Sequence, residues 1–219
     1  MTDMIKAVIF DLDGVIINSE PLHDESTAIV LQKNGISISE KERKQFLGLN
    51  DKEIFSQVVK ENKLKKTPED LIQEREKVYF DLIKKKGLDL FPGVLEAIQK
   101  FSKRYKLAIT TSSEKSKVDF TLKKFNLSQY FPIIITGEDI TKGKPDPEPY
   151  IKTIKQLGVK SKECLVIEDS INGMKSALDA GCFCIAVTNT FPAAQLKQAD
   201  MIVQNISEIN ENVITLVGM

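Results

Sequence analysis

Short, nearly continuous runs of apolar residues recur along the chain, and β-branched side chains are frequent in them. The runs cover residues 6–10, 106–111, 132–137, 163–169, 182–187 and 200–205. Runs of this length and continuity are typical of strands that are buried on both faces of a parallel sheet. Between them, helical spacing predicts helices at residues 94–105, 115–125, 147–157 and 171–180. This alternation predicts a doubly wound α/β fold, with a mostly parallel sheet and helices on both faces.

One long segment breaks the alternation directly after the first predicted strand. Residues 19–87 are rich in charge and amphipathic, without a convincing strand. The pattern predicts helices at residues 21–33, 40–46, 51–61 and 68–85. The last of these follows Thr67-Pro68, which is typical of an N-cap and a first-position proline. We therefore predict an α/β core of residues 1–18 and 88–219, and an inserted α-helical cap of residues 19–87 that acts as a lid.

Composition narrows the classes of partner. The 31 Lys and Arg residues balance 31 Asp and Glu residues, so no basic excess points to nucleic acid or an anionic membrane. No apolar stretch approaches the roughly 20 residues of a membrane-spanning helix, and the amino terminus does not have the pattern of a signal peptide. The three cysteines, Cys164, Cys182 and Cys184, lack metal-like spacing and suit a reducing compartment. We expect a cytoplasmic protein with no nucleic-acid or membrane partner.

Polar residues follow four successive predicted strands. They are Asp11-Leu12-Asp13-Gly14, Thr111-Ser112-Ser113, Lys144-Pro145 and Glu168-Asp169-Ser170. Ligands of parallel α/β sheets bind beyond the carboxyl ends of the strands, so these residues should converge at one edge of the sheet. Each group alone has an ordinary interpretation as a solvated turn, a helix N-cap or a polar strand end. Their occurrence together, each at a strand end, favours a catalytic site.

The residue types at these strand ends suit phosphoryl transfer. Asp11 and Asp169 offer the hard oxygen ligands that Mg²⁺ prefers. A carboxylate such as Asp11 can attack phosphorus when Mg²⁺ and Lys144 offset the negative charges. Asp13, two residues after Asp11, could protonate the leaving oxygen and then activate water.

Two further residues are candidates for holding the phosphoryl group. The hydroxyl of Thr111 and the backbone amide of Ser112 follow the second predicted strand, and both could donate to phosphoryl oxygens. The sequence thus predicts a magnesium-dependent enzyme that acts on a small phosphorylated metabolite.

These motifs resemble those of the haloacid dehalogenase-like phosphohydrolase superfamily over essentially the whole chain. The matching segments are FDLDGV (10–15), ITTSS (109–113), GKPDPEPY (143–150) and VIEDSINGM (166–174). The resemblance implies an aspartyl-phosphate on Asp11, general acid/base catalysis by Asp13, and Mg²⁺ bound by Asp11, Asp169 and the carbonyl of Asp13. It also implies that Glu168 supports the metal site. The nearest subgroup is that of β-phosphoglucomutase-like proteins and sugar-phosphate phosphatases.

The resemblance leaves hydrolysis and phosphomutase activity open. Mutases of the subgroup carry an arginine shortly after a cap glycine, whereas Gly48-Leu49-Asn50-Asp51 places an acid there. The cap entry, with Glu20 and His23, is similar to that of sugar-phosphate phosphatases, and His23 either faces the substrate or lies at a surface or hinge. We therefore favour a phosphatase, and we expect a monomer because the cap itself closes the site. A dehalogenase, a phosphonate-cleaving enzyme and a non-catalytic binding domain are weaker alternatives.

Overall fold

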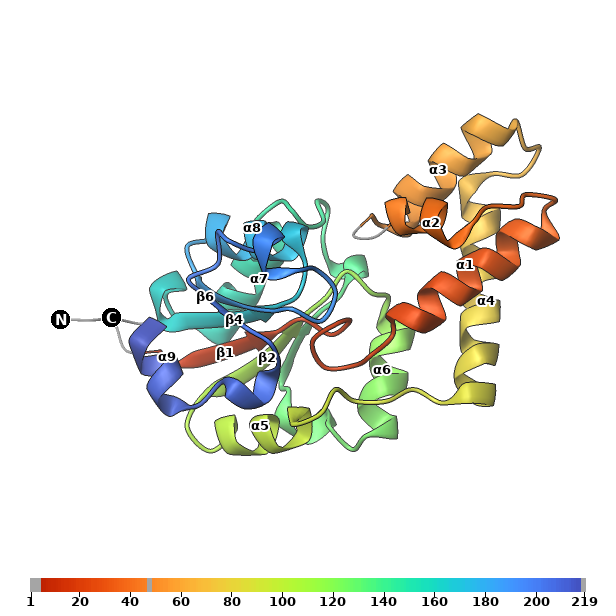
Figure 1. Cartoon of the computed structure of the whole chain (residues 1–219). Helices are drawn as coiled ribbons and strands as arrows, with labels where there is room; N and C mark the ends of the chain where they lie inside the picture. The colour runs from red at the N-terminus through yellow and green to blue at the C-terminus, as the bar shows by residue number, and fades with distance from the viewer. Residues whose placement is uncertain (1–4, 47–48, 218–219) are drawn as a thin grey trace. The chain divides into compact units, whose positions relative to one another are not determined.

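The computed structural model describes residues 5–46 and 49–217 of the chain. The chain divides into two compact units (Figure 1). One unit is formed by the residues up to Asn18 together with those from Leu90 onward, and the other by Ser19–Asp89.

The first unit is built on a six-stranded sheet with the order β3-β2-β1-β4-β5-β6. Its strands are β1 (Ala7–Phe10), β2 (Lys106–Thr110), β3 (Ile133–Ile135), β4 (Cys164–Glu168), β5 (Phe183–Val187) and β6 (Met201–Val203). All neighbouring strands pair in parallel. The central strand β1 is buried along its whole length, as its uninterrupted apolar sequence requires. The doubly wound α/β prediction is therefore confirmed, and each strand lies within a predicted run.

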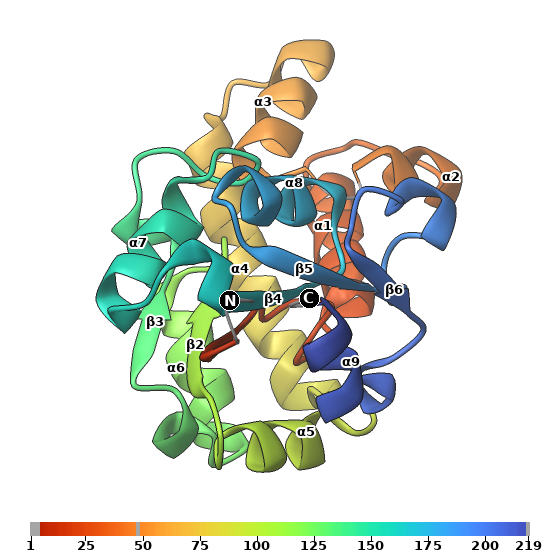
Figure 2. The ribbon, with the colours of Figure 1, turned by 90° about the vertical axis from the view of Figure 1, so that its left-hand side faces the viewer.

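Helices cover both faces of this sheet (Figure 2). They are α5 (Val94–Phe101), α6 (Lys115–Lys124), α7 (Glu148–Leu157), α8 (Ile171–Asp179) and α9 (Glu211–Val217). Helices α7 and α8 lie on one face, whereas α5 and α9 lie on the other. Single 3₁₀ turns occur at Ser128–Tyr130, Gly137–Asp139, Ser161–Glu163, Ala193–Gln195 and Ile206–Glu208. In the described part of the chain, no helix combines the length and apolarity needed to span a membrane.

The second unit is helical in its described residues. It contains α1 (Glu20–Lys33), α2 (Glu40–Arg43), a 3₁₀ turn at Lys44–Phe46, α3 (Asp51–Asn62) and α4 (Pro68–Lys86). Its apolar interior is formed by side chains from α1, α3 and α4, with Phe55 and Leu71 fully buried. Thr67 caps α4 in a reciprocal arrangement with Asp70, as the sequence predicts. Gly48, used above in comparing the cap with mutases, lies outside the described residues.

The loop after β1 folds back on itself before the chain leaves the first unit. The backbone N–H groups of Ile16 and Ile17 both donate to the carbonyl of Leu12, at 2.9 and 3.0 Å. Ile17 also forms an isolated antiparallel bridge with Leu90, and Phe91 N–H donates to the Ile16 carbonyl at 3.1 Å. The segment leaving the first unit is thereby hydrogen-bonded to the segment that returns to it.

Candidate active site

The residues predicted to act in catalysis gather at the carboxyl ends of the central strands. Asp11 directly follows β1, Glu168 is the last residue of β4, and Asp169 comes next. Each of these three acids offers a carboxylate oxygen within 4.8 Å of those of the other two, and all three are buried. This arrangement can hold a metal ion, because ionised carboxylates brought together without water need a cation between them.

Lys144 is the cation that links this group of acids. Its Nζ donates to Asp11 Oδ1 at 2.6 Å, to Glu168 Oε1 at 2.5 Å and to the backbone carbonyl of Thr110 at 3.0 Å. The ammonium also lies 5.1 Å from the centre of the Tyr150 ring. Burial opposes its charge, but the carboxylates of Asp11 and Glu168 outweigh burial and raise the pKa of Lys144.

Glu168 is held on both carboxylate oxygens. Besides Lys144, the Tyr150 hydroxyl donates to Oε1 at 2.9 Å. Oε2 accepts from the backbone N–H groups of Asp169 and Ser170 at 3.1 and 3.2 Å, and from the Ser170 hydroxyl at 2.9 Å. Burial works against ionisation, yet these partners, Lys144 foremost, lower the pKa of Glu168. These partners favour the ionised form of Glu168, whose contact with Nζ orients Lys144.

Asp11 and Asp169 are held where ionisation of their carboxyl groups is unfavourable. Burial raises the pKa of Asp11 to about 7, with Lys144 offsetting part of the effect and Glu168 and Asp13 adding to it. Burial, together with the charges of Glu168 and Asp11, raises the pKa of Asp169 well above its usual range. The hydroxyl of Thr190 donates to Asp169 Oδ2. A divalent cation between these two acids would offset both shifts by favouring the ionised carboxylates.

Asp13 faces helix α6. The Ser113 hydroxyl donates to its Oδ2 at 2.5 Å, and Lys117 Nζ donates to its Oδ1 at 2.5 Å. The sequence pattern predicts no role for Lys117, Tyr150 or Thr190. The available signal is weak: Lys117 lies in the first turn of the helix predicted at residues 115–125, four residues after Ser113.

The two predicted phosphate-binding residues lie where β2 ends. Thr111 is buried, and its hydroxyl accepts a hydrogen bond from Ser113 N–H at 3.0 Å. Ser112 is exposed. The turn leaves the Ser112 backbone at the edge of the sheet that bears the acids.

Gly14 lets the loop after β1 pass close to Asp169. Its φ of +80° is in the left-handed region. A Cβ added there would lie 1.8 Å from Asp169 Oδ2 and 2.9 Å from Thr190 Oγ1. Asn189 Nδ2 donates to the Gly14 carbonyl at 2.7 Å. A glycine is therefore required at this position both by conformation and by space.

The predicted cap residues belong to the second unit. Glu20 is the exposed first residue of α1. His23 is half-buried, and its ring stacks on that of Tyr79 with 4.5 Å between centres. The buried guanidinium of Arg75 donates to His23 Nδ1 and forms an ion pair with Asp51. His23 thus takes part in a polar network of the second unit, and substrate contact by Glu20 and His23 stays a prediction.

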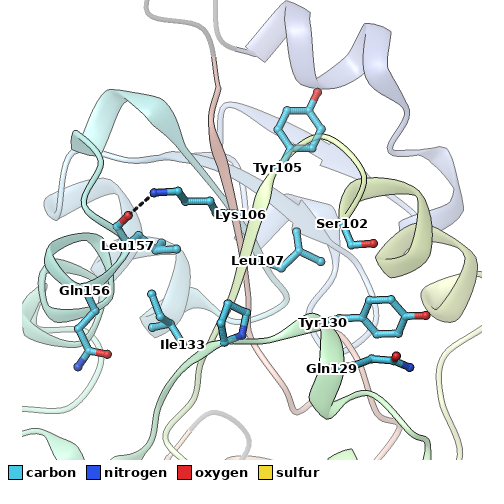
Figure 3. A pocket seen from close by; sticks show the side chains of 10 residues that line it. Ser102, Tyr105, Lys106, Leu107, Gln129, Tyr130, Ile133, Gln156 and Leu157 are labelled. Carbon is cyan, nitrogen blue, oxygen red and sulfur yellow. Dashed lines mark hydrogen bonds between the residues drawn. The ribbon is translucent and has the colours of Figure 1, made fainter.

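A cavity of about 550 Å³ lies at the opposite edge of the sheet (Figure 3). It is lined by Lys106 and Ile133, the first residues of β2 and β3, and by Tyr105, Tyr130 and Leu157. Lys106 Nζ donates to the Leu157 carbonyl at 2.9 Å. The acids follow the last residues of their strands, so this cavity is separate from the candidate site.

Comparisons with known proteins agree with this architecture. The family model described as haloacid dehalogenase-like hydrolase matches residues 8–187. The phosphorylated carbohydrates phosphatase of Thermotoga maritima is 32% identical over 182 residues, which are 81% of this chain and 82% of that protein. SUPPRESSOR OF QUENCHING 1 of Arabidopsis thaliana is 33% identical over 214 residues; the match spans 95% of this chain but only 20% of that protein.

A solved structure extends the similarity to the whole fold. The HAD hydrolase of family IA, variant 3, from Entamoeba histolytica superposes with a TM-score of 0.88 at 28% identity. The match covers 98% of this chain and 99% of that one.

Proposed function

The chain belongs to the haloacid dehalogenase-like hydrolases and is a phosphomonoester hydrolase of that family, and from this premise we propose its chemistry and substrate class. The protein is a Mg²⁺-dependent phosphatase that hydrolyses a small phosphorylated metabolite, a sugar phosphate, through an aspartyl-phosphate on Asp11. A cytoplasmic monomer without nucleic-acid or membrane partners stays a prediction from the sequence.

The observation that carries this proposal is the contact of Lys144 with Asp11. A buried carboxylate is a poor nucleophile toward an anionic phosphate unless positive charge compensates both groups. Lys144 lies 2.6 Å from Asp11 Oδ1 and is fixed by Glu168 at 2.5 Å, so one cation is already held beside the nucleophile. The same cation could contact a phosphoryl oxygen without first being brought into place.

The residues present fit a magnesium ion. Asp11 and Asp169 supply oxygen donors within one small buried group, and burial, with the neighbouring carboxylates adding to it, raises the pKa of both acids. A cation at this place would favour their ionised forms. We assign the ion to these two carboxylates and to the carbonyl of Asp13. Glu168, with its hydrogen bonds on both oxygens, supports the site by orienting Lys144. When bound, Mg²⁺ supplies positive charge that stabilises the transferring phosphoryl group.

The reaction then proceeds in two in-line displacements. An Asp11 carboxylate oxygen attacks phosphorus, the bond to the leaving oxygen breaks, and the Asp13 carboxyl group gives its proton to that oxygen. Asp13 next takes a proton from a water molecule whose oxygen attacks phosphorus. The bond from phosphorus to Asp11 breaks, which releases phosphate and restores the enzyme. Thr111 and Ser112 hold the phosphoryl oxygens.

The ion pair of Arg75 in the second unit is one observation that favours hydrolysis over a phosphomutase reaction. A mutase must hold a second phosphate, which requires a basic group with charge to spare. Arg75 is a buried cation of this unit, and it is already paired with the carboxylate of Asp51. Hydrolysis of a monophosphate needs no second anion site. We propose that Ser19–Asp89 acts as the cap, and that Glu20 and His23 contact the substrate.

The test is a screen of phosphorylated sugars and small phosphorylated acids with Mg²⁺ or EDTA, which scores both phosphate release and isomer formation. We expect Mg²⁺-dependent phosphate release that Asp11→Asn abolishes while the thermal unfolding midpoint is retained. Asp119→Asn, an exposed acid of α6, is the matched control and should keep full activity. Persistent Mg²⁺-dependent turnover by Asp11→Asn would refute the proposal, and isomer formation in place of phosphate release would favour the mutase.

A further inference from the structure

Asp13 is restrained on both of its carboxylate oxygens by residues that follow β2. Ser113 holds Oδ2 and Lys117 holds Oδ1, each with a contact of 2.5 Å. The side chain of Asp13 is 27% exposed, whereas that of Lys117 is 8% exposed. A carboxylate of this exposure could otherwise adopt several rotamers, so the two contacts select one orientation.

Two features of the position of Lys117 oppose its positive charge. It lies in the first turn of α6, a turn that contains no acidic residue, and the N-cap residue Glu114 makes no side-chain capping bond. A cation at a helix amino terminus opposes the helix dipole, and burial of an ammonium adds a desolvation cost. The carboxylate of Asp13 offsets both effects, which ties the lysine to the candidate site.

Lys117 also completes the charge balance of the site. Asp11, Asp13, Glu168 and Asp169 contribute four carboxylates. Lys144 pairs with both Asp11 and Glu168, and Lys117 pairs with Asp13. Two ammonium groups against four carboxylates leave two negative charges, which is the charge that one divalent cation neutralises. The two lysines therefore divide the site into a nucleophile side and an acid/base side.

From this geometry we infer that Lys117, assisted by Ser113, is the positioning residue for Asp13. It fixes the carboxyl group through which the proton passes to the leaving oxygen and from the attacking water. This inference rests on the proposed function. It assigns no contact between Lys117 and substrate, so its effect is exerted through Asp13.

A double-mutant cycle tests the assignment with an aryl phosphate and the best sugar phosphate of the screen. Lys117→Met should lower kcat by about 10- to 100-fold, part of the usual contribution of general acid/base catalysis, with KM changed by less than about threefold. Lys117→Arg should restore part of the loss. In an Asp13→Asn background, Lys117→Met should lower kcat by less than a further factor of about two, because the effects of residues that act as a unit do not add.

Controls separate positioning from a structural role. Lys115→Met removes an exposed lysine from the same helical turn and should leave kcat and KM unchanged. Ser113→Ala removes the hydrogen bond to the other carboxylate oxygen of Asp13. If Lys117→Met fails to fold, the same double-mutant cycle is measured with Ser113→Ala in its place. Losses of kcat that add in the double variant, or an effect on KM only, would overturn this inference and leave the proposed function standing. Absence of turnover by the wild-type protein would overturn the proposed function and this inference with it.

Discussion

Gly14→Ala tests whether the loop after β1 and Asp169 form one site. The added Cβ would lie 1.8 Å from Asp169 Oδ2, whereas ordinary contact begins at 3.4 Å, so the carboxylate or the loop must move by about 1.6 Å. A displacement of about 1 Å at a catalytic group can cost on the order of 100-fold in rate. We therefore expect kcat/KM to fall at least about 100-fold, equivalent to roughly 2.7 kcal/mol of transition-state stabilisation.

The substitution also carries a conformational cost that must be separated from the displacement. Alanine at φ +80° costs roughly 1–2 kcal/mol of stability. Gly158→Ala is the matched control, because Gly158 has φ +65° in the same unit and no heavy atom within 4 Å of an added Cβ. We expect the control to lose stability in chemical denaturation without losing activity.

The assay is phosphate release over a titration of substrate and a titration of Mg²⁺, with unfolding curves for both variants. Gly14→Ala should need more Mg²⁺ for half-maximal rate, because Asp169 is a proposed ligand. Wild-type kcat/KM and Mg²⁺ dependence in Gly14→Ala would refute the reasoning, since Asp169 would then tolerate the displacement or play no part.

Two further predictions concern charge. Burial raises the pKa of Asp11 from 3.8 to about 7, so the folded metal-free protein becomes less stable as the pH rises from 3.8 to about 7 and Asp11 loses its proton. Mg²⁺ binds the ionised carboxylate and should therefore raise the unfolding midpoint more at pH 8 than at pH 6. Equal shifts of the midpoint at the two pH values in a thermal-shift assay would contradict this prediction. Asp51→Asn removes the charged partner of buried Arg75 and should lower the unfolding free energy by roughly 1–3 kcal/mol in chemical denaturation. The control Asp81→Asn, at an exposed ion pair with Lys84, should have little effect, and equal losses in the two variants would contradict the expectation.

The arrangement of the sheet could be predicted because its strands are short and apolar on both faces. Helix boundaries are harder to predict from the sequence. The helix predicted at residues 94–105 ends at Phe101 in the structure, where turn residues follow. Helix α9 was missed, because its sequence, ENVITLV, contains β-branched residues that suit a strand equally well. Local pattern thus identifies buried strands better than short terminal helices.

In the candidate site, the residues at strand ends could be predicted from the sequence, whereas those on helices could not. The convergence of Asp11, Lys144 and Glu168 follows from one rule, that ligands of parallel sheets bind beyond the carboxyl ends of the strands. Lys117 and Tyr150 come from helices, and their reach toward Asp13 and Glu168 depends on side-chain direction, which spacing alone does not give. The roles of these groups in catalysis stay predictions until the variants are measured.

The bridge between Ile17 and Leu90 has a consequence for how such a chain can be engineered and can diversify. The residues that precede and follow the 19–89 segment are paired with each other within the first unit, through Ile17 and Leu90. The segment can therefore be shortened, lengthened or exchanged without altering the pairing of the strands. A minimal protein that joins Asn18 to Leu90 through a few glycines should therefore keep the register of β1 against β2 and β4. If the proposed function holds, exchange of residues 19–89 should change which phosphorylated substrate is preferred, while the proposed catalytic residues stay at the end of β1.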